Sequence, residues 1–97
     1  MNSSEISDYF QNRQTKILDS IRQIVDIESP SRDFAGSAAV VDWLEKQARA
    51  ISTDFQTERI AAENYGEHFI LRAFPSEKKS VLLLGHTDTV HPKGSFR

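Results

Sequence analysis

Hydrophobic residues recur with helical spacing through the first part of the chain. From residue 5 to residue 28, apolar side chains lie three, four or seven positions apart, which places them on one face of a helix. They are Ile6, Phe10, Ile17, Ile21, Ile24 and Val25. The pattern predicts one helix over residues 5–28, capped by one of the polar residues 2–4. Its end is expected near Ser29, because a residue that precedes proline avoids helical backbone angles.

A second amphipathic segment covers residues 34–51. Its apolar stripe consists of Val40, Leu44, Ala48 and Ile51. Asp33 precedes the segment and is a candidate N-cap. We predict that this helix, like the first, packs its stripe into a core rather than against a membrane or a partner helix.

The period of the pattern changes after the second helix. Residues 54–60 and 68–74 alternate loosely and predict two strands, with a turn at residues 64–66 between them. Residues 80–85 give the strongest strand signal, because Val81–Leu84 is an unbroken apolar run. A strand that is apolar on both faces is normally covered on both faces, as in the centre of an α/β sheet. Two helices followed by three strands therefore predict an α/β fold with an incomplete sheet.

Composition narrows the possible partners and metal ligands. The chain has 97 residues, which is one small domain at most, and 12 basic against 14 acidic residues give a net charge of −2. Nucleic acid is not an expected partner, because no basic stripe is present. The cysteine count is zero, so any metal must be held by His, Asp or Glu. Residues 1–10 have no basic charge and no apolar run is long enough to span a bilayer, so we expect a cytoplasmic protein without a membrane partner.

The most informative motif follows the third expected strand and reads Gly-His-Thr-Asp-Thr-Val-His-Pro-Lys-Gly over residues 85–94. Ligand sites in open α/β sheets lie beyond the carboxyl ends of strands. In an extended backbone, His86 and Asp88 point the same way. An imidazole that binds a metal usually donates its other N–H to an oxygen acceptor, often a carboxylate. His-x-Asp supplies such a pair, although this short pattern by itself also fits a hydrogen-bonded loop histidine.

Residues 81–94 resemble the first metal-binding motif of the zinc-dependent exopeptidase and deacylase family. That family includes acetylornithine deacetylase, succinyl-diaminopimelate desuccinylase, aminoacylase and the glutamate carboxypeptidases, and the motif is most similar to the last branch. The resemblance implies a three-layer zinc-peptidase-like catalytic domain, of which residues 1–97 form the N-terminal portion. It implies His86 as a zinc ligand and Asp88 as the active-site carboxylate that orients it. The remainder of that domain, with its other metal ligands and general base, and the dimerisation domain are expected to be absent from these residues.

The resemblance also implies a reaction. A complete active site of this family holds two Zn²⁺ ions, with Co²⁺ or Mn²⁺ as alternative metals, and hydrolyses an amide bond with a metal-activated water. The expected substrate is a small N-acyl amino acid or a short peptide, and the full-length protein is expected to form a homodimer. Residues 1–97 alone are expected to be inactive and to bind zinc weakly.

Several alternatives are less favoured by the sequence. His91 lies near His86 and Asp88, but a mononuclear site on one loop offers zinc too few ligands. His68 is expected at a sheet edge, and Glu58, Glu63 and Glu67 on a solvated face rather than in an acid/base pair. Two other functions remain open: a domain that keeps this fold without its chemistry, and a free-standing small α/β interaction domain.

Overall fold

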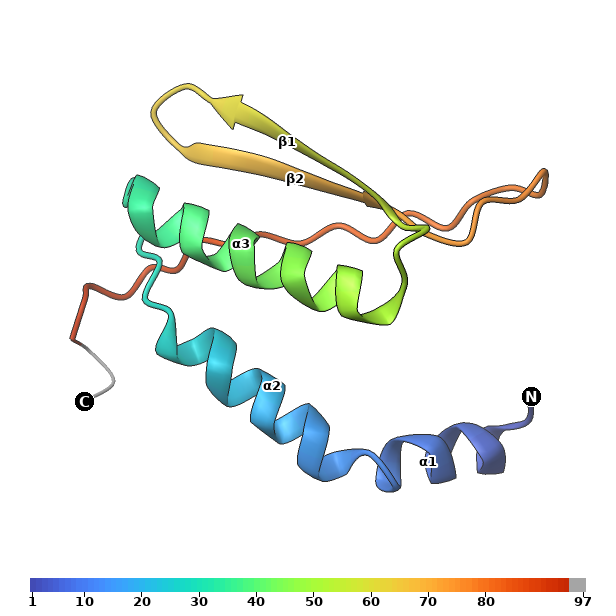
Figure 1. Ribbon diagram of the computed structural model, residues 1–97. Helices are drawn as coiled ribbons and strands as arrows, with labels where there is room; N and C mark the ends of the chain where they lie inside the picture. The colour runs from blue at the N-terminus through green and yellow to red at the C-terminus, as the bar shows by residue number, and fades with distance from the viewer. Residues whose placement is uncertain (95–97) are drawn as a thin grey trace.

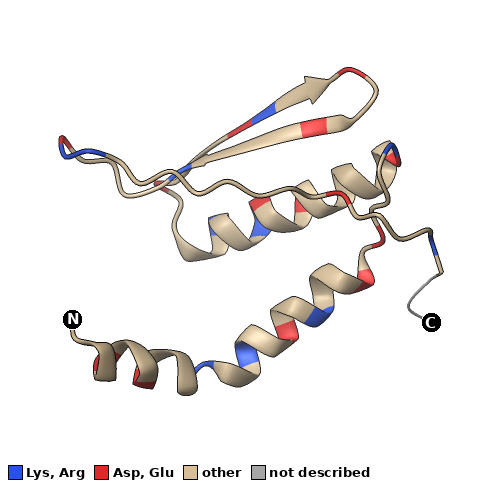
Figure 2. Ribbon diagram, turned by 180° about the vertical axis from the view of Figure 1, so that it is seen from behind, with Lys and Arg blue, Asp and Glu red and all other residues tan. Residues whose placement is uncertain are grey.

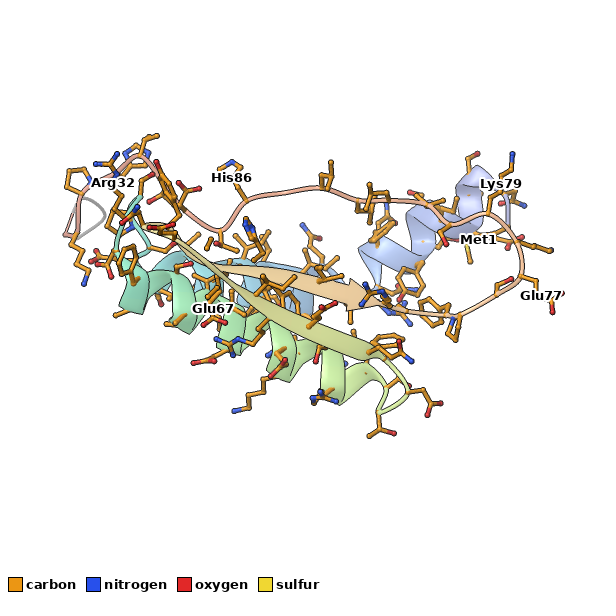
Figure 3. The ribbon with its side chains drawn as sticks, turned by 90° about the horizontal axis from the view of Figure 1, so that it is seen from above. Met1, Arg32, Glu67, Glu77, Lys79 and His86 are labelled. Carbon is orange, nitrogen blue, oxygen red and sulfur yellow. The ribbon has the colours of Figure 1, made fainter. Side chains whose placement is uncertain are left out.

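The computed structural model describes residues 1–94 and has a mixed α/β architecture (Figure 1). Its elements in chain order are helices α1 (Ser3–Gln11), α2 (Gln14–Asp26) and α3 (Phe34–Ile51), and strands β1 (Gln56–Ala62) and β2 (Gly66–Arg72). In Figure 1 the two strands lie on one side of α3, and α1 and α2 lie on the other. After β2 the chain reverses and runs back along the molecule to residue 94 (Figures 1 and 3).

The N-terminal helical region is broken, so the prediction of one helix over residues 5–28 is wrong. The backbone N–H of Arg13 donates to the carbonyl of Phe10 at 3.1 Å instead of to the carbonyl of Tyr9. The Arg13 guanidinium takes over the Tyr9 carbonyl, also at 3.1 Å. This tighter turn separates α1 from α2 without interrupting the apolar periodicity, which is why the periodicity did not reveal it. The cap is as predicted, since the Asn2 side chain accepts from the N–H of Glu5 at 2.9 Å.

Helix α3 matches its predicted range of residues 34–51 and its predicted cap. The Asp33 carboxylate accepts a hydrogen bond from the N–H of Gly36 at 2.8 Å, satisfying one of the free donors at the helix start. The buried apolar side chains of the described residues are Val40, Val41, Ala48 and Phe55. The predicted stripe fails at its last position, because Ile51 is 73% exposed at the helix end.

The two strands form an antiparallel hairpin whose register pairs Ala62 with Gly66 and Gln56 with Arg72. Each strand lies nearer the turn than predicted: residues 56–62 rather than 54–60, and residues 66–72 rather than 68–74. The turn is tight because Asn64 and Gly66 both adopt positive φ angles, of 67° and 89°, which Asn and Gly tolerate best. Pairing can therefore begin next to the turn.

Helix α3 packs mainly against β2, whereas α1 and α2 contribute no buried residue. One hydrogen bond, from Trp43 Nε1 to Gln23 Oε1 at 2.9 Å, links α3 to α2. The buried apolar residues thus lie on α3 and at Phe55, and the prediction that the first helix packs its stripe into a core is wrong for this structure. A core this small is typical of so short a chain.

The predicted strand over residues 80–85 does not form. Among residues 1–94, none of residues 80–85 makes a backbone hydrogen bond to another segment, and the side chains of Val81–Leu84 are 77–89% exposed. The run therefore has no cover on either face, which agrees with the incomplete sheet that the sequence predicts. A strand is stable only when a neighbouring strand satisfies its backbone groups, and the only sheet of the described residues ends at β2.

Charges of both signs lie along α2 and α3 (Figure 2); they alternate in sign on α2, whereas α3 carries two acidic residues followed by two basic ones. Arg59 on β1 binds both carboxylate oxygens of Glu67 on β2, at 2.7 and 2.8 Å, and also pairs with Asp42 on α3.

None of the helices described in residues 1–94 has the length and apolar character needed to cross a bilayer.

Candidate functional site

Two segments far apart in the sequence are joined edge to edge and bring the His86 region against the α2–α3 connection. Pro30 and Thr89 form a parallel β-bridge. The N–H of Thr89 donates to the carbonyl of Ser29 at 2.8 Å, and the N–H of Ser31 donates to the carbonyl of Thr89 at 3.0 Å. The buried hydroxyl of Ser29 adds a third bond, to the carbonyl of Thr87 at 2.6 Å. We call this contact between residues 28–33 and 86–94 the junction.

Charged groups hold the far side of the junction. Lys93 Nζ lies 2.8 Å from Asp33 Oδ2, and the N–H of Gly94 donates to Glu28 Oε1 at 2.7 Å. Lys93 and the N–H of Gly36 lower the pKa of Asp33, and Asp33 in turn raises the pKa of Lys93. Asp33 therefore serves two elements at once, as the cap of α3 and as the anchor of the motif's lysine.

His86 stands at the start of the junction, and its side chain is 82% exposed. The ring points away from the hairpin (Figure 3). Nδ1 lies 2.9 Å from the backbone carbonyl oxygen of Asp88 and 3.2 Å from Asp88 Oδ1. A carbonyl oxygen only accepts hydrogen bonds, so the proton of the neutral ring belongs on Nδ1. This tautomer leaves the lone pair of Nε2 directed away from the chain's own acceptor, as a metal ligand requires.

Asp88 is engaged through both carboxylate oxygens. Oδ1 faces the His86 ring, and Oδ2 accepts a hydrogen bond from the hydroxyl of Ser31 at 2.6 Å. The Ser31 hydroxyl, and to a smaller extent His86, lower the pKa of Asp88, so the group is ionised near neutral pH. A carboxylate held in this way suits the support of an imidazole better than direct binding of a metal.

A cavity of about 1200 Å³ opens beside the junction, with walls from α2, α3, β2 and residues 84–92. His68 and His91 also line it, along with His86 and Asp88. No three His, Asp or Glu side chains converge as a metal-binding group within residues 1–94, so His86, Asp88 and His91 do not assemble the mononuclear alternative. The described residues therefore offer one imidazole with a supporting carboxylate, His86 and Asp88.

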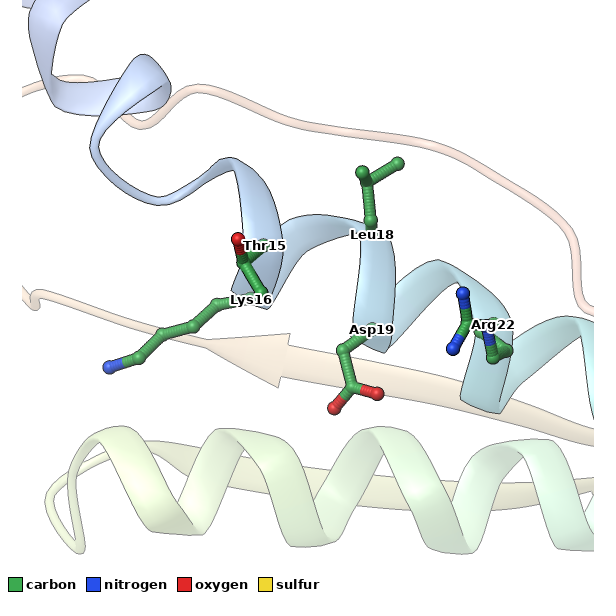
Figure 4. Close-up of a pocket in the computed structure, with 5 residues that line it drawn as sticks. All are labelled: Thr15, Lys16, Leu18, Asp19 and Arg22. Carbon is green, nitrogen blue, oxygen red and sulfur yellow. The ribbon is translucent and has the colours of Figure 1, made fainter.

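A smaller pocket of about 320 Å³ lies along α2, lined by Thr15, Lys16, Leu18, Asp19 and Arg22 (Figure 4). Leu18 and Asp19 point in opposite directions from the helix (Figure 4). All five residues are exposed on the surface of α2, and none of them makes a backbone hydrogen bond to the junction. The side chains that line this pocket do not converge on a common centre where they could bind a ligand.

The sequence identified His86 and Asp88, and the structure brings the two into contact as expected. The expected solvated face of the hairpin carries ion pairs instead of an acid/base pair, with Glu67 on Arg59 and Glu58 on Arg72. Sequence reasoning missed Ser31, which lies 57 residues before Asp88. Its only sequence signal is the Ser-Pro-Ser break after α2, which predicts a helix end and gives no sign of a contact with Asp88.

Comparison with known proteins adds no relative: no family model, no curated protein and no solved structure matches this chain.

Proposed function

We propose that residues 1–97 are the N-terminal part of the catalytic domain of a dinuclear zinc amidohydrolase, either a metallo-carboxypeptidase or an N-acyl amino acid deacylase. The observation that carries the proposal is the His86–Asp88 pair, in which Nδ1 faces two acceptor oxygens and Nε2 is left for a ligand. The pair lies within the Gly-His-Thr-Asp-Thr-Val motif that resembles this family. The proposal includes a zinc-peptidase-like domain in a cytoplasmic homodimer.

In this proposal His86 binds zinc through Nε2, and Asp88 holds the ring in the Nδ1–H tautomer and increases its basicity. A two-zinc centre supplies a water of lowered pKa and a polarised scissile carbonyl. The remaining metal ligands and the general base belong to segments beyond residue 97. The substrate is a small N-acyl amino acid or a short peptide with a free carboxylate.

Zinc titration of the isotopically labelled chain tests the assignment. We expect Zn²⁺ to shift the ¹⁵N resonance of His86 Nε2 in a weak, saturable manner, because the chain offers one clear ligand. The His86→Ala variant is expected to lose this binding. The matched control is His68→Ala, which removes another cavity-lining imidazole from β2 and is expected to bind zinc like the wild type. Equal zinc binding by the wild type and His86→Ala contradicts the proposal.

Activity is tested on the full-length protein. With zinc present, it is expected to hydrolyse N-acyl amino acids or peptides with a C-terminal glutamate, and His86→Ala is expected to abolish turnover. Asp88→Asn is expected to lower metal affinity or activity by about 10–100-fold, the range for a group that orients a ligand. Unchanged turnover in His86→Ala overturns the assignment.

A second candidate is a non-catalytic α/β interaction domain, which keeps the fold without the chemistry. The observation in its favour is the exposed apolar run Val81–Leu84, since contiguous exposed apolar surface is common at sites of protein contact. A full-length protein that binds zinc at His86 but hydrolyses none of the substrates named above would favour this candidate.

A further inference from the structure

We infer that Ser31 is a positioning residue for the metal site: its hydroxyl fixes the Asp88 carboxylate, and through it the tautomer and orientation of the His86 ring. This inference rests on the proposed role of His86 as a zinc ligand. It extends the site from a motif on one loop to a chain of three side chains drawn from two segments, Ser31, Asp88 and His86.

The hydrogen bonds in this chain have a defined direction. The Ser31 hydroxyl has one proton and lies 2.6 Å from Asp88 Oδ2 but 3.4 Å from the carbonyl of Thr89, so it donates to the carboxylate. Hydrogen bonds to an ionised carboxylate are shorter and about twice as strong as those between neutral groups. The other oxygen, Oδ1, remains directed at His86 Nδ1. Ser31 thus occupies one end of the carboxylate and leaves the other for the imidazole.

The backbone of Ser31 is itself held in place. Its N–H donates to the carbonyl of Thr89 at 3.0 Å. Thr89 follows Asp88 in the chain, so this bond holds the Ser31 backbone next to the carboxylate that its hydroxyl contacts. The hydroxyl therefore meets Asp88 without first having to order a loop, which is the condition for effective support of a ligand.

Ser29 provides a matched control within the same junction. Its hydroxyl also donates a bond of 2.6 Å to the motif segment, but the acceptor is the backbone carbonyl of Thr87. Both substitutions to alanine remove one hydroxyl and one short hydrogen bond. Only Ser31→Ala removes a bond to the carboxylate that faces His86.

The test measures the His86 tautomer in the 97-residue chain, from the ¹⁵N shifts of both ring nitrogens at a pH where the ring is neutral. The wild type is expected to carry the proton on Nδ1. Ser31→Ala is expected to increase the fraction with the proton on Nε2 and to weaken the zinc-induced shift by about 10-fold, the lower limit for an outer partner of a ligand. The loss is partial because the Asp88 backbone carbonyl still accepts from Nδ1.

Three further variants make the outcome decisive. Ser31→Thr keeps the hydroxyl and is expected to restore both readouts, whereas Ser29→Ala is expected to lower the urea midpoint and leave the tautomer unchanged. Identical tautomer populations in the wild type and Ser31→Ala overturn the inference, as does an equal change in Ser29→Ala, which would indicate general loosening of the junction. Zinc binding that survives His86→Ala instead overturns the proposed function. The tautomer measurement does not depend on zinc, so it still tests whether Ser31 positions the His86 ring.

Discussion

The last part of the described chain has two halves that differ in how they are held: residues 80–85 are apolar and unpaired, and residues 86–94 are hydrogen-bonded to a distant segment. Residues 80–85 include the most apolar run of the sequence, yet they pair with nothing among residues 1–94 and leave Val81–Leu84 exposed. Residues 86–94 are polar, yet they are fastened to residues 28–33 by backbone and side-chain bonds. An apolar side chain is stabilised only where other apolar surface covers it, whereas a hydrogen bond needs only one partner at the right distance and angle. A polar loop can therefore be held in place more firmly than the apolar run that precedes it.

The largest expected effect comes from breaking the junction at Gly36, at the start of α3. A Cβ at this position would lie 2.4 Å from the carbonyl oxygen of Glu28 and 3.0 Å from the Cα of Ser29, both backbone atoms. We expect Gly36→Ala to lower the free energy of unfolding by about 2 kcal/mol in urea, because overpacking outweighs the gain in helix propensity. The control is Gly85→Ala in the unpaired half, where nothing lies within 4 Å of the added atom. Equal stability of both variants would contradict the view that the junction is tightly packed.

A smaller loss is expected from Ser29→Ala. Ser29 is 3% exposed, and its hydroxyl donates to the backbone carbonyl of Thr87. The substitution leaves that carbonyl without this hydrogen bond. We expect a loss of about 1 kcal/mol in the free energy of unfolding, measured in urea. Ser80→Ala, which removes the same group from the unpaired half, is expected to have no measurable effect. A similar loss in both variants would show that the two halves are equally ordered.

The Lys93–Asp33 pair predicts a pH-dependent contribution. The folded state lowers the pKa of Asp33, so this group favours folding above the ordinary aspartate value of about 3.9 and loses that contribution as the pH falls through its folded pKa. We expect Lys93→Met to reduce the difference in stability between pH 7 and pH 3, in urea unfolding at both values. Part of the difference persists through the bond from Gly36. Lys79→Met, outside the junction, should keep the wild-type difference, and an unchanged difference in Lys93→Met would exclude the pair as its source.

The smallest effect is expected at Leu83, whose side chain is 89% exposed. Leu83→Ser is expected to change the free energy of unfolding by less than about 0.5 kcal/mol, because a side chain in water loses no burial on substitution. Val41→Ser is the comparison within the core, since Val41 is 0% exposed, and it is expected to be strongly destabilising. A large loss in Leu83→Ser would show that Val81–Leu84 is covered in solution.

The sequence by itself determined the features that depend on near neighbours. It predicted a mixture of helices and strands, the Asp33 cap, the range of α3, the hairpin turn and the contact of His86 with Asp88, because each arises within a few residues. Even the two wrong strand limits differ from the observed ones only in how close pairing comes to the turn.

The tertiary structure decided what depends on residues far apart in the chain. The absence of a pairing partner within residues 1–94 left Val81–Leu84 without a sheet. The hydroxyl of Ser31 reached Asp88 across 57 positions. Periodicity reports which face of an element is apolar, but it carries no information about which distant group satisfies a given donor or acceptor.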